Sequence, residues 1–135
     1  MTHPWKAKRK PNCYKVVCID PNYKNVYWSY LNDQETRVKY VPHVPTKPII
    51  PNSKLFVFPL NALKEAKQLI YRYGEACIFM AYAENMYLAD FNYPCSPSLN
   101  GTKFYWENYK ESKSYCIWTH WADSVTLLKK AIPIK

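Results

Sequence analysis

Short apolar runs separated by turn residues recur along the chain, and this pattern predicts a protein made mostly of strands. The runs are rich in β-branched and aromatic side chains, which suit a pleated, half-buried surface. The predicted strands are YKVVCI (14–19), NVYWSYL (25–31), TRVKYV (36–41), KLFVF (54–58), ACIFMAY (76–82), KFYWENY (103–109), SYCIWTHW (114–121) and VTLLKKAIPI (125–134). The turn signal DPN (20–22) joins the first two runs, so we expect them to form a hairpin.

The third run alternates between apolar and polar positions, which predicts a half-exposed strand. Val38 and Tyr40 fall on one face, and Arg37 and Lys39 fall on the other. The last run, 125–134, has two interpretations, because its leucines would suit a short helix while its β-branched residues and proline favour a strand. We favour the strand.

Two stretches between these runs predict loops. Residues 42–52, PHVPTKPIIPN, contain four prolines, which lack an amide donor, so we expect an extended loop along the surface. Residues 83–101 are mixed and end in PCSPSLNG, and no strand is predicted there.

One segment has helical spacing, and it predicts a helix from about 62 to 73. Its apolar side chains recur at spacings of three and four, at Leu63, Ala66, Ile70 and Tyr73. Asn61 is a suitable N-cap, Leu60 can pack as the outer half of a hydrophobic staple, and Gly74 is a natural stop. Together with the strands, this helix predicts an α+β fold: a mixed, mainly antiparallel sheet of five to seven strands with one main helix.

Length and charge suggest a basic arm followed by one domain. The chain has 135 residues and a net charge of +9, of which four charges come from Lys6, Lys8, Arg9 and Lys10. We therefore predict a flexible basic arm over 1–12 and a single globular domain over 13–135. The basic balance favours an anionic partner, either nucleic acid or a phosphorylated small molecule.

The residue usage also bears on the source and the compartment. Lysine far exceeds arginine, and Asn, Tyr and Ile are frequent, which indicates an AT-rich genome such as that of a phage, a large virus or a low-GC bacterium. The segment MTHPWKAKRKP carries charge but no apolar run follows it, so no secretory signal is predicted. The cysteine count is odd, at five, so reduced thiols in a cytoplasm are expected, the host's if the protein is phage- or virus-encoded.

Several classes of function are excluded or disfavoured by what the chain lacks. With two glycines in total, it cannot build a glycine-rich phosphate loop, and no nucleophile elbow or metalloprotease motif occurs. No apolar run approaches the ~20 residues of a membrane-spanning helix. Cys116 and His120 are too far apart along a strand to share one zinc ion. We therefore predict no metal, no cofactor, no catalytic residue and no membrane partner, and lean against an enzyme.

Aromatic residues make up 17% of the chain, and they suggest a stacking surface edged by positive charge. We expect them to line a pocket for a nucleotide-like anion, with His120 beside the stacking rings and His43 as a lid from the proline-rich loop. The candidate stackers are Trp106, Trp118 and Trp121, and the candidate charge partners are Lys103, Arg37 and Lys39. The bland alternative is that the aromatic side chains fill the core and that His120 is a half-buried packing residue.

The order of several motifs resembles a group of small uncharacterised phage and bacterial proteins. The motifs are YKVV (14–17), WSY (28–30), VKYVP (38–42), LFVF (55–58) and WADSVTLLKK (121–130). This resemblance implies a compact single domain of the kind often encoded by mobile elements, with no established activity.

More remotely, the order of the first strand, a serine-bearing second strand and the unit LFVFPLNALKEAK resembles small ADP-ribosyltransferase-like folds. That resemblance implies an Arg or His on the first strand, where this chain has YKVV, and a late catalytic Glu, for which Glu75 and Glu84 are not convincingly placed. Ser29 could occupy the second-strand position.

We therefore expect a non-enzymatic binding module, a phage- or virus-type counter-defence accessory that sequesters a nucleotide-like anion. Three alternatives remain open. The first is a DNA- or RNA-binding protein that uses the basic arm and the aromatic surface. The second is an inhibitor that binds a protein through exposed Tyr and Trp side chains. The third is a degenerate or active ADP-ribosyltransferase-like enzyme.

Overall fold

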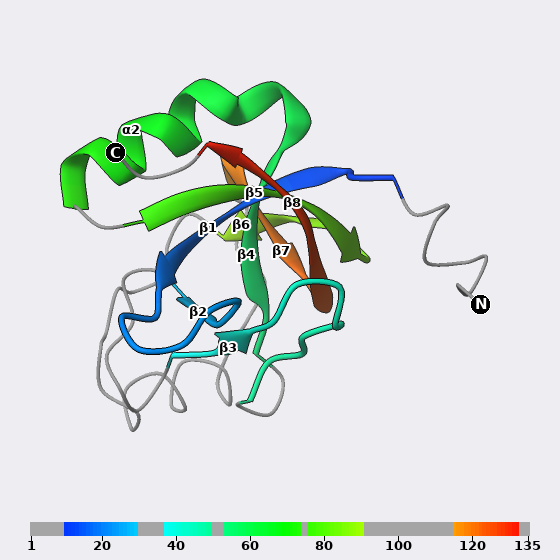
Figure 1. Ribbon diagram of the computed structural model, residues 1–135. Helices are drawn as coiled ribbons and strands as arrows, with labels where there is room; N and C mark the ends of the chain where they lie inside the picture. The colour runs from blue at the N-terminus through cyan, green and yellow to red at the C-terminus, as the bar shows by residue number, and fades with distance from the viewer. Residues whose placement is uncertain (1–9, 30–36, 50–52, 74–75, 91–114, 133–135) are drawn as a thin grey trace.

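The computed structural model describes residues 10–29, 37–49, 53–73, 76–90 and 115–132, with no side-chain description for 69–73, 88–90, 115–119 and 132. The strands are β1 (Cys13–Ile19), β2 (Tyr27–Ser29), β3 (Lys39–Tyr40), β4 (Leu55–Pro59), β5 (Ala76–Glu84), β6 (Tyr87–Asp90), β7 (Tyr115–Ala122) and β8 (Ser124–Ile132). A 3₁₀ turn, η1 (Leu60–Ala62), leads directly into the single described helix, α2 (Leu63–Tyr73). Figure 1 shows the strands as a curved sheet with α2 on one side of it.

The α+β class and the mainly antiparallel sheet are confirmed, but the number of strands differs from the prediction. Every ladder between described strands is antiparallel, and these strands number eight instead of five to seven. The additional strand is β6, in a stretch for which no strand was predicted. The favoured interpretation of the last run is confirmed, because β8 is a strand. The predicted strand 103–109 lies outside the described residues.

β1 is the central strand, and it changes its neighbour part-way along one edge. On one edge it pairs with β5 over Cys13 to Cys18. On the other edge, Cys13 and Tyr14 pair with β4, whereas Val17 onward pairs with β2. The sheet therefore forks beside Lys15, with β2 and β3 on one branch and β4, β7 and β6 on the other.

The segment 41–49, which we call the strap, follows β3 and forms hydrogen bonds with β8. Val44 donates its amide to the carbonyl of Val41 at 3.1 Å, closing a turn in which His43 takes a positive φ of 67°. His43 then donates to the carbonyl of Leu127 at 2.8 Å, and Thr46 exchanges two hydrogen bonds of 2.9 Å with Val125. The described part of the proline-rich loop is thus a turn at His43 followed by a bridge at Thr46, not a uniformly extended segment, and it covers an edge of β8.

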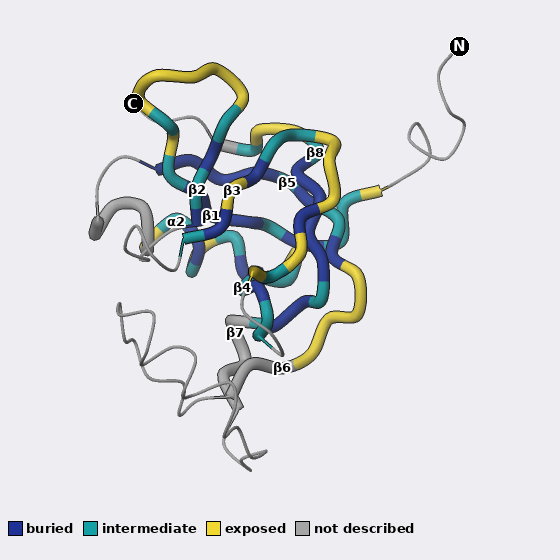
Figure 2. Tube along the Cα trace, turned by 90° about the horizontal axis from the view of Figure 1, so that it is seen from below, coloured by how far each residue is buried: buried dark blue, intermediate teal, exposed yellow. Residues whose placement is uncertain are grey.

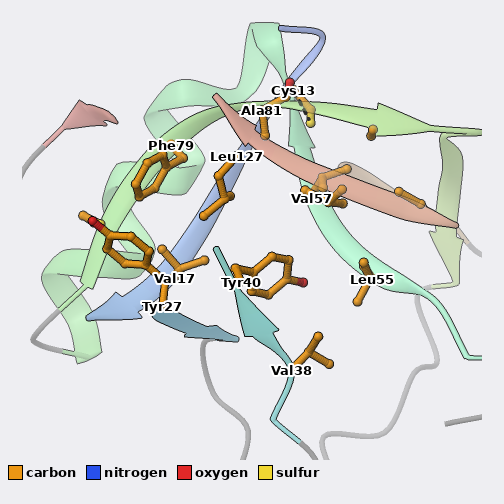
Figure 3. Close-up of a cluster of buried hydrophobic side chains, with 14 residues drawn as sticks. Cys13, Val17, Tyr27, Val38, Tyr40, Leu55, Val57, Phe79, Ala81 and Leu127 are labelled. Carbon is orange, nitrogen blue, oxygen red and sulfur yellow. Dashed lines mark hydrogen bonds between the residues drawn. The ribbon is translucent and has the colours of Figure 1, made fainter. Parts of the chain in front are cut away.

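The main core lies inside the curve of the sheet, where alternate residues of the strands meet. Figure 3 shows Val17, Tyr40, Val57, Phe79 and Leu127 converging from five different strands. Tyr27 stacks edge-on against Phe79 with ring centroids 4.8 Å apart. The strict alternation of TRVKYV explains the third strand, because Val38 and Tyr40 are buried while Lys39 is exposed.

The helix covers the opposite face of the sheet. Ala66 packs with Val16, Ala76 and Ile78, and Leu63 lies against this cluster. The predicted span of 62–73 is confirmed to within one residue, but the predicted cap is wrong, because Asn61 lies inside η1. Pro59, with extended backbone angles and no side-chain cap, precedes that turn. Gly74 lies outside the described residues.

The proposed division into arm and domain remains a prediction, because residues 1–9 are outside the described part and only Lys10 of the four arm cations is placed, exposed to solvent. Among the described residues, no helix has the length and apolar character needed to cross a membrane.

Candidate functional site: a basic aromatic turn site

The residues predicted to form the pocket divide into three groups. Trp106 and Lys103 lie outside the described residues, as do the arm residues Lys6, Lys8 and Arg9. Trp118 belongs to β7, but its side chain is not described. The structure places the side chains of Arg37, Lys39, His43, His120 and Trp121.

Trp121 and His120 extend from β7 to opposite faces, because side chains alternate along a strand. Trp121 is 4% exposed and packs edge-on against Phe56, with ring centroids 6.3 Å apart. His120 is the register partner of Val57 and therefore faces the same side of the sheet as that core residue. Burial lowers the pKa of His120 below its ordinary value. The two side chains thus do not form one stacking surface.

Arg37 and Lys39, in contrast, flank a tryptophan that we did not predict as a site residue. The guanidinium carbon of Arg37 lies 3.8 Å from the ring centroid of Trp28. Lys39 is the register partner of Trp28, so the two side chains share a face. A cation stacked on an indole at this distance is a favourable electrostatic contact. These three residues form a basic aromatic surface on the β2–β3 pair.

Asp20 fixes this surface to the β1–β2 turn. The indole nitrogen of Trp28 donates to Asp20 Oδ2 at 2.8 Å, and the amides of Asn22 and Tyr23 donate to Asp20 Oδ1 at 2.8 and 3.1 Å. The hydrogen bond from Trp28 and then that from Asn22 hold the pKa of Asp20 below its ordinary value. The predicted turn at DPN is therefore confirmed, with the carboxylate as its organising group.

The same turn borders an open hollow of about 520 Å³. Its lining includes Asp20, Tyr23, Lys24, Tyr27 and Lys130. The ammonium of Lys130 lies 5.8 Å from the ring centroid of Tyr27, and Tyr23 is 69% exposed. Figure 2 shows the turn as an exposed loop between the ends of β1 and β2. We call the hollow, together with Trp28, Arg37 and Lys39, the turn site.

The turn site carries an excess of positive charge. Its cations are Lys24, Arg37, Lys39 and Lys130, and its only acid is Asp20, which already accepts three hydrogen bonds. Exposed aromatic surface beside cations that form no ion pair among the described residues suits a ligand that combines a planar ring with an anionic group. His43, the predicted lid, is exposed but belongs to the strap, where its backbone is bonded to β8.

A second unusual cluster lies inside the sheet, and we call it the fork cluster. Lys15 is 5% exposed, and its Nζ donates to the carbonyl of Phe56 at 2.6 Å. The same Nζ lies 5.2 Å from the ring centroid of Tyr40. Burial lowers the pKa of Lys15 from 10.5 to about 8. The hydroxyl of Tyr40 is buried without a hydrogen-bond partner, and burial raises its pKa.

Asp123 organises a polar network at the bend between β7 and β8. It forms an ion pair with Lys54 at 2.5 Å, and its other oxygen accepts hydrogen bonds from Asn85 at 3.0 Å and Tyr87 at 2.8 Å. Hydrogen bonds from Lys54, Tyr87 and Asn85 outweigh the desolvation of the carboxylate and lower the pKa of Asp123. This explains the acid in the WADS motif as a structural residue.

Replacing Asp123 with alanine should lower the free energy of unfolding by about 1–2 kcal/mol, because three donors lose a partly exposed charged acceptor. Urea denaturation at pH 7 measures this effect. Asp20→Ala provides a comparison at another turn carboxylate, and Lys47→Ala, an exposed residue without such a network, should change stability by less than ~0.5 kcal/mol. A loss for Asp123→Ala no larger than that for Lys47→Ala would contradict the structural role.

Ser29, which the remote resemblance placed at a catalytic position, has a structural contact. Its hydroxyl accepts a hydrogen bond from the amide of Val38 at 2.8 Å, which ties β2 to the residue that precedes β3.

Within the described ranges, no group of three or more His, Cys, Asp or Glu side chains could hold a metal ion. Cys13, Cys18 and Cys77 are free thiols.

Comparison of the chain with protein-family models, curated proteins and solved structures finds no match.

Sequence patterns contained partial signals for the residues that we missed. Trp28 lies in a predicted hairpin with Asp20 in its turn, so the hairpin register brings them together, but the register itself was not predicted. Lys15 lies between inward-facing Cys13 and Val17 in a strand predicted to be buried, and this position was a signal that we did not use. Lys130 comes close to the turn only through the pairing of β5 with β8.

Proposed function

We propose that this protein is a non-enzymatic binding module that takes up a nucleotide-like anion at the turn site. The observation that carries the proposal is the hollow of about 520 Å³ where Tyr23 and Tyr27 lie beside Lys24 and Lys130. Its volume falls within the range of ~300–1,000 Å³ typical of small-molecule sites. Tyr23 offers an exposed ring for stacking, and the two ammonium groups offer donors for a phosphate.

The function we assign to such a module is the sequestration of a host signalling nucleotide by a phage- or virus-type accessory protein in the host cytoplasm. The motif resemblance and the AT-rich residue usage support that context. Non-catalytic binding is supported by Ser29, whose hydroxyl serves the backbone, and by Asp20, whose carboxylate oxygens serve the turn.

Tryptophan fluorescence and thermal unfolding of the full chain, measured against mono-, di- and cyclic nucleotides, test this function. Binding of a ligand at 100 times its dissociation constant should stabilise the fold by ~2.7 kcal/mol. The indole of Trp28, between Asp20 and Arg37, is a reporter beside the site. We expect one nucleotide class to shift both readouts, and a lack of response to every nucleotide would refute the proposal.

For the nucleotide class that responds, the double variant Lys24→Met/Lys130→Met should weaken binding at least ~10-fold, because each lysine contributes a charge-assisted contact to phosphate. The matched control is Lys47→Met on the strap, where the lysine is equally exposed but does not line the hollow. Equal affinities for the two variants would place the ligand elsewhere.

The nucleic-acid alternative is favoured by one specific observation, the row of Arg37, Trp28 and Lys39 on the β2–β3 pair. Short single-stranded DNA distinguishes it from the main proposal. If the row binds a strand, affinity should fall steeply with added salt as counterions are released. In that case Arg37→Met and Lys39→Met should weaken binding of the oligonucleotide, whereas Lys24→Met/Lys130→Met should have the smaller effect.

A further inference from the structure

The fork cluster places a lysine where β1 changes its described neighbour from β4 to β2. Lys15 pairs with Phe79 of β5 on one edge, and on its other edge the described pairs change from β4, opposite Cys13 and Tyr14, to β2, opposite Val17 onward. The carbonyl of Phe56, on the diverging β4, accepts from Lys15 Nζ at 2.6 Å. The lysine side chain thus spans the fork and satisfies a backbone acceptor of the neighbouring branch.

The residues that the structure describes use only part of the hydrogen-bonding capacity of these two side chains. An ammonium group has three N–H donors, and the contact to Phe56 uses one of them. Tyr40 adds a hydroxyl that is buried without a hydrogen-bond partner. In Figure 3 this hydroxyl is directed toward the side of the core where Leu55 of β4 is drawn, the strand that also supplies the carbonyl for Lys15.

The charge of Lys15 is also uncompensated among the residues that the structure describes. The ion pair found in those ranges joins Lys54 to Asp123. The groups that face Lys15 are the thiol of Cys13 and the ring of Tyr40, and burial keeps both of them protonated at neutral pH. A buried cation is stable only when it is paired or hydrogen-bonded. Unused donors on a buried cation select an acceptor that carries negative charge.

We propose that Lys15 and Tyr40 form a binding site for the carboxylate group of a small molecule at the fork of the sheet. One carboxylate oxygen accepts from the ammonium of Lys15, and the other accepts from the hydroxyl of Tyr40. His120, on the side of β7 that also carries the core residue Ala122, adds a buried Nδ1 without a partner near this branch of the sheet. The site is separate from the turn site and does not depend on the function proposed for it.

Sodium acetate is the simplest probe of this site. The midpoint of thermal unfolding of the full chain is measured at pH 7 against acetate concentration, with sodium chloride replacing acetate at equal ionic strength. Holding the ionic strength at or above about 0.1 M screens exposed charges, so the response reports a buried contact. We expect acetate to raise the midpoint above that in chloride. Equal midpoints in the two salts would overturn the proposal.

Tyr40→Phe is the decisive variant, because it removes one oxygen and keeps the ring. Deleting a buried hydroxyl that has no partner should leave the variant folded in chloride, as stable as the wild type or more so. Its dissociation constant for acetate should nevertheless rise ~10-fold, equivalent to about 1.4 kcal/mol. An acetate response equal to that of the wild type would overturn the proposal. Lys15→Met keeps the aliphatic stem and, where it folds, should also lose the response.

Two controls separate this site from other basic surfaces. Lys39 neighbours Tyr40 on β3, but its side chain is exposed. The acetate response of Lys39→Met should therefore match that of the wild type. Lys24→Met/Lys130→Met disables the turn site and should also keep the full response. Loss of the response in this double variant, with retention in Tyr40→Phe, would assign acetate binding to the turn site and overturn the fork site.

Discussion

Replacing Leu127 with alanine is expected to lower the free energy of unfolding by about 2–5 kcal/mol, the range found when a buried leucine leaves a cavity. Leu127 is 1% exposed and lies in the core cluster together with Tyr40, Phe79 and Ala81. Its carbonyl also accepts the hydrogen bond from His43 that joins the strap to β8. A domain of this kind is stable by only ~5–15 kcal/mol, so the loss is a large fraction of the total.

Equilibrium denaturation in urea measures this effect, and Leu60→Ala is the matched control. Leu60 is also a leucine, but it is 44% exposed in η1, so its truncation should cost much less. The slope of unfolding against urea should stay the same for both variants, because the surface exposed on unfolding hardly changes. Similar losses at the two positions would mean that the core is not packed around β8.

The patterns that predicted the fold best are those set by local geometry. Alternation in TRVKYV placed Val38 and Tyr40 inside because the pleat of a strand sends neighbouring side chains to opposite faces. The spacing of Leu63 and Ala66 predicted the buried side of the helix for the equivalent helical reason. The cap at Asn61 was wrong because the chain enters the helix through a 3₁₀ turn after Pro59.

The features that were not predicted depend on pairing between distant strands. The fork of β1, which buries Lys15, requires β2 and β4 to compete for one edge of the same strand. Trp121 was predicted as a stacker, but its register opposite Phe56 turns it into a packing residue, while Trp28 acquires the position beside Arg37. No local pattern fixes such registers, because a shift of one residue exchanges the two faces of a strand.

The turn site and the fork cluster illustrate two different uses of lysine in one basic chain. At the turn, Lys24 and Lys39 are exposed, so their charges attract a ligand at little cost in desolvation. At the fork, Lys15 is buried, and its charge is maintained against a large desolvation penalty. The second situation has a measurable consequence for stability, since it couples folding to the protonation of the lysine.

The contribution of Lys15 to stability should grow above about pH 8, whereas the net stability should fall above pH 9, because a buried lysine and the buried thiols act in opposite directions. Burial lowers the pKa of Lys15 from 10.5 to about 8 and raises that of Cys13 from 9.0 to about 12 and that of Cys77 from 9.0 to about 11. A lowered folded-state pKa gives stability that is complete above pH 10.5 and is lost as the pH falls through 8. Raised folded-state values give stability that is complete below pH 9.0 and is lost as the pH rises toward 11 and 12.

The magnitudes decide which effect dominates in each interval. Full titration of one group shifts the free energy of unfolding by ~1.4 kcal/mol per pH unit, so Lys15 alone adds about 1 kcal/mol between pH 8 and 9. Above pH 9 the thiols of Cys13 and Cys77, together with that of Cys18, whose pKa burial also raises, oppose one ammonium, and the net loss by pH 11 is about 2 kcal/mol or more. Tyr40, whose pKa burial also raises, adds to the loss above pH 10.

Urea denaturation of the wild type and of single variants, repeated from pH 7 to pH 11, separates these contributions. Lys15→Met should lower the change in stability from pH 8 to 9 by about 1 kcal/mol relative to the wild type, whereas Lys39→Met, which changes an exposed lysine on β3, should leave that change as it is in the wild type. Cys13→Ala should lessen the loss above pH 9, because the unfolded chain then has one thiol fewer to release a proton. The variants are compared by the change of stability with pH, so a constant loss from altered packing does not affect the result. A change in stability from pH 8 to 9 that is the same in the wild type and in Lys15→Met would show that burial does not lower the pKa of Lys15.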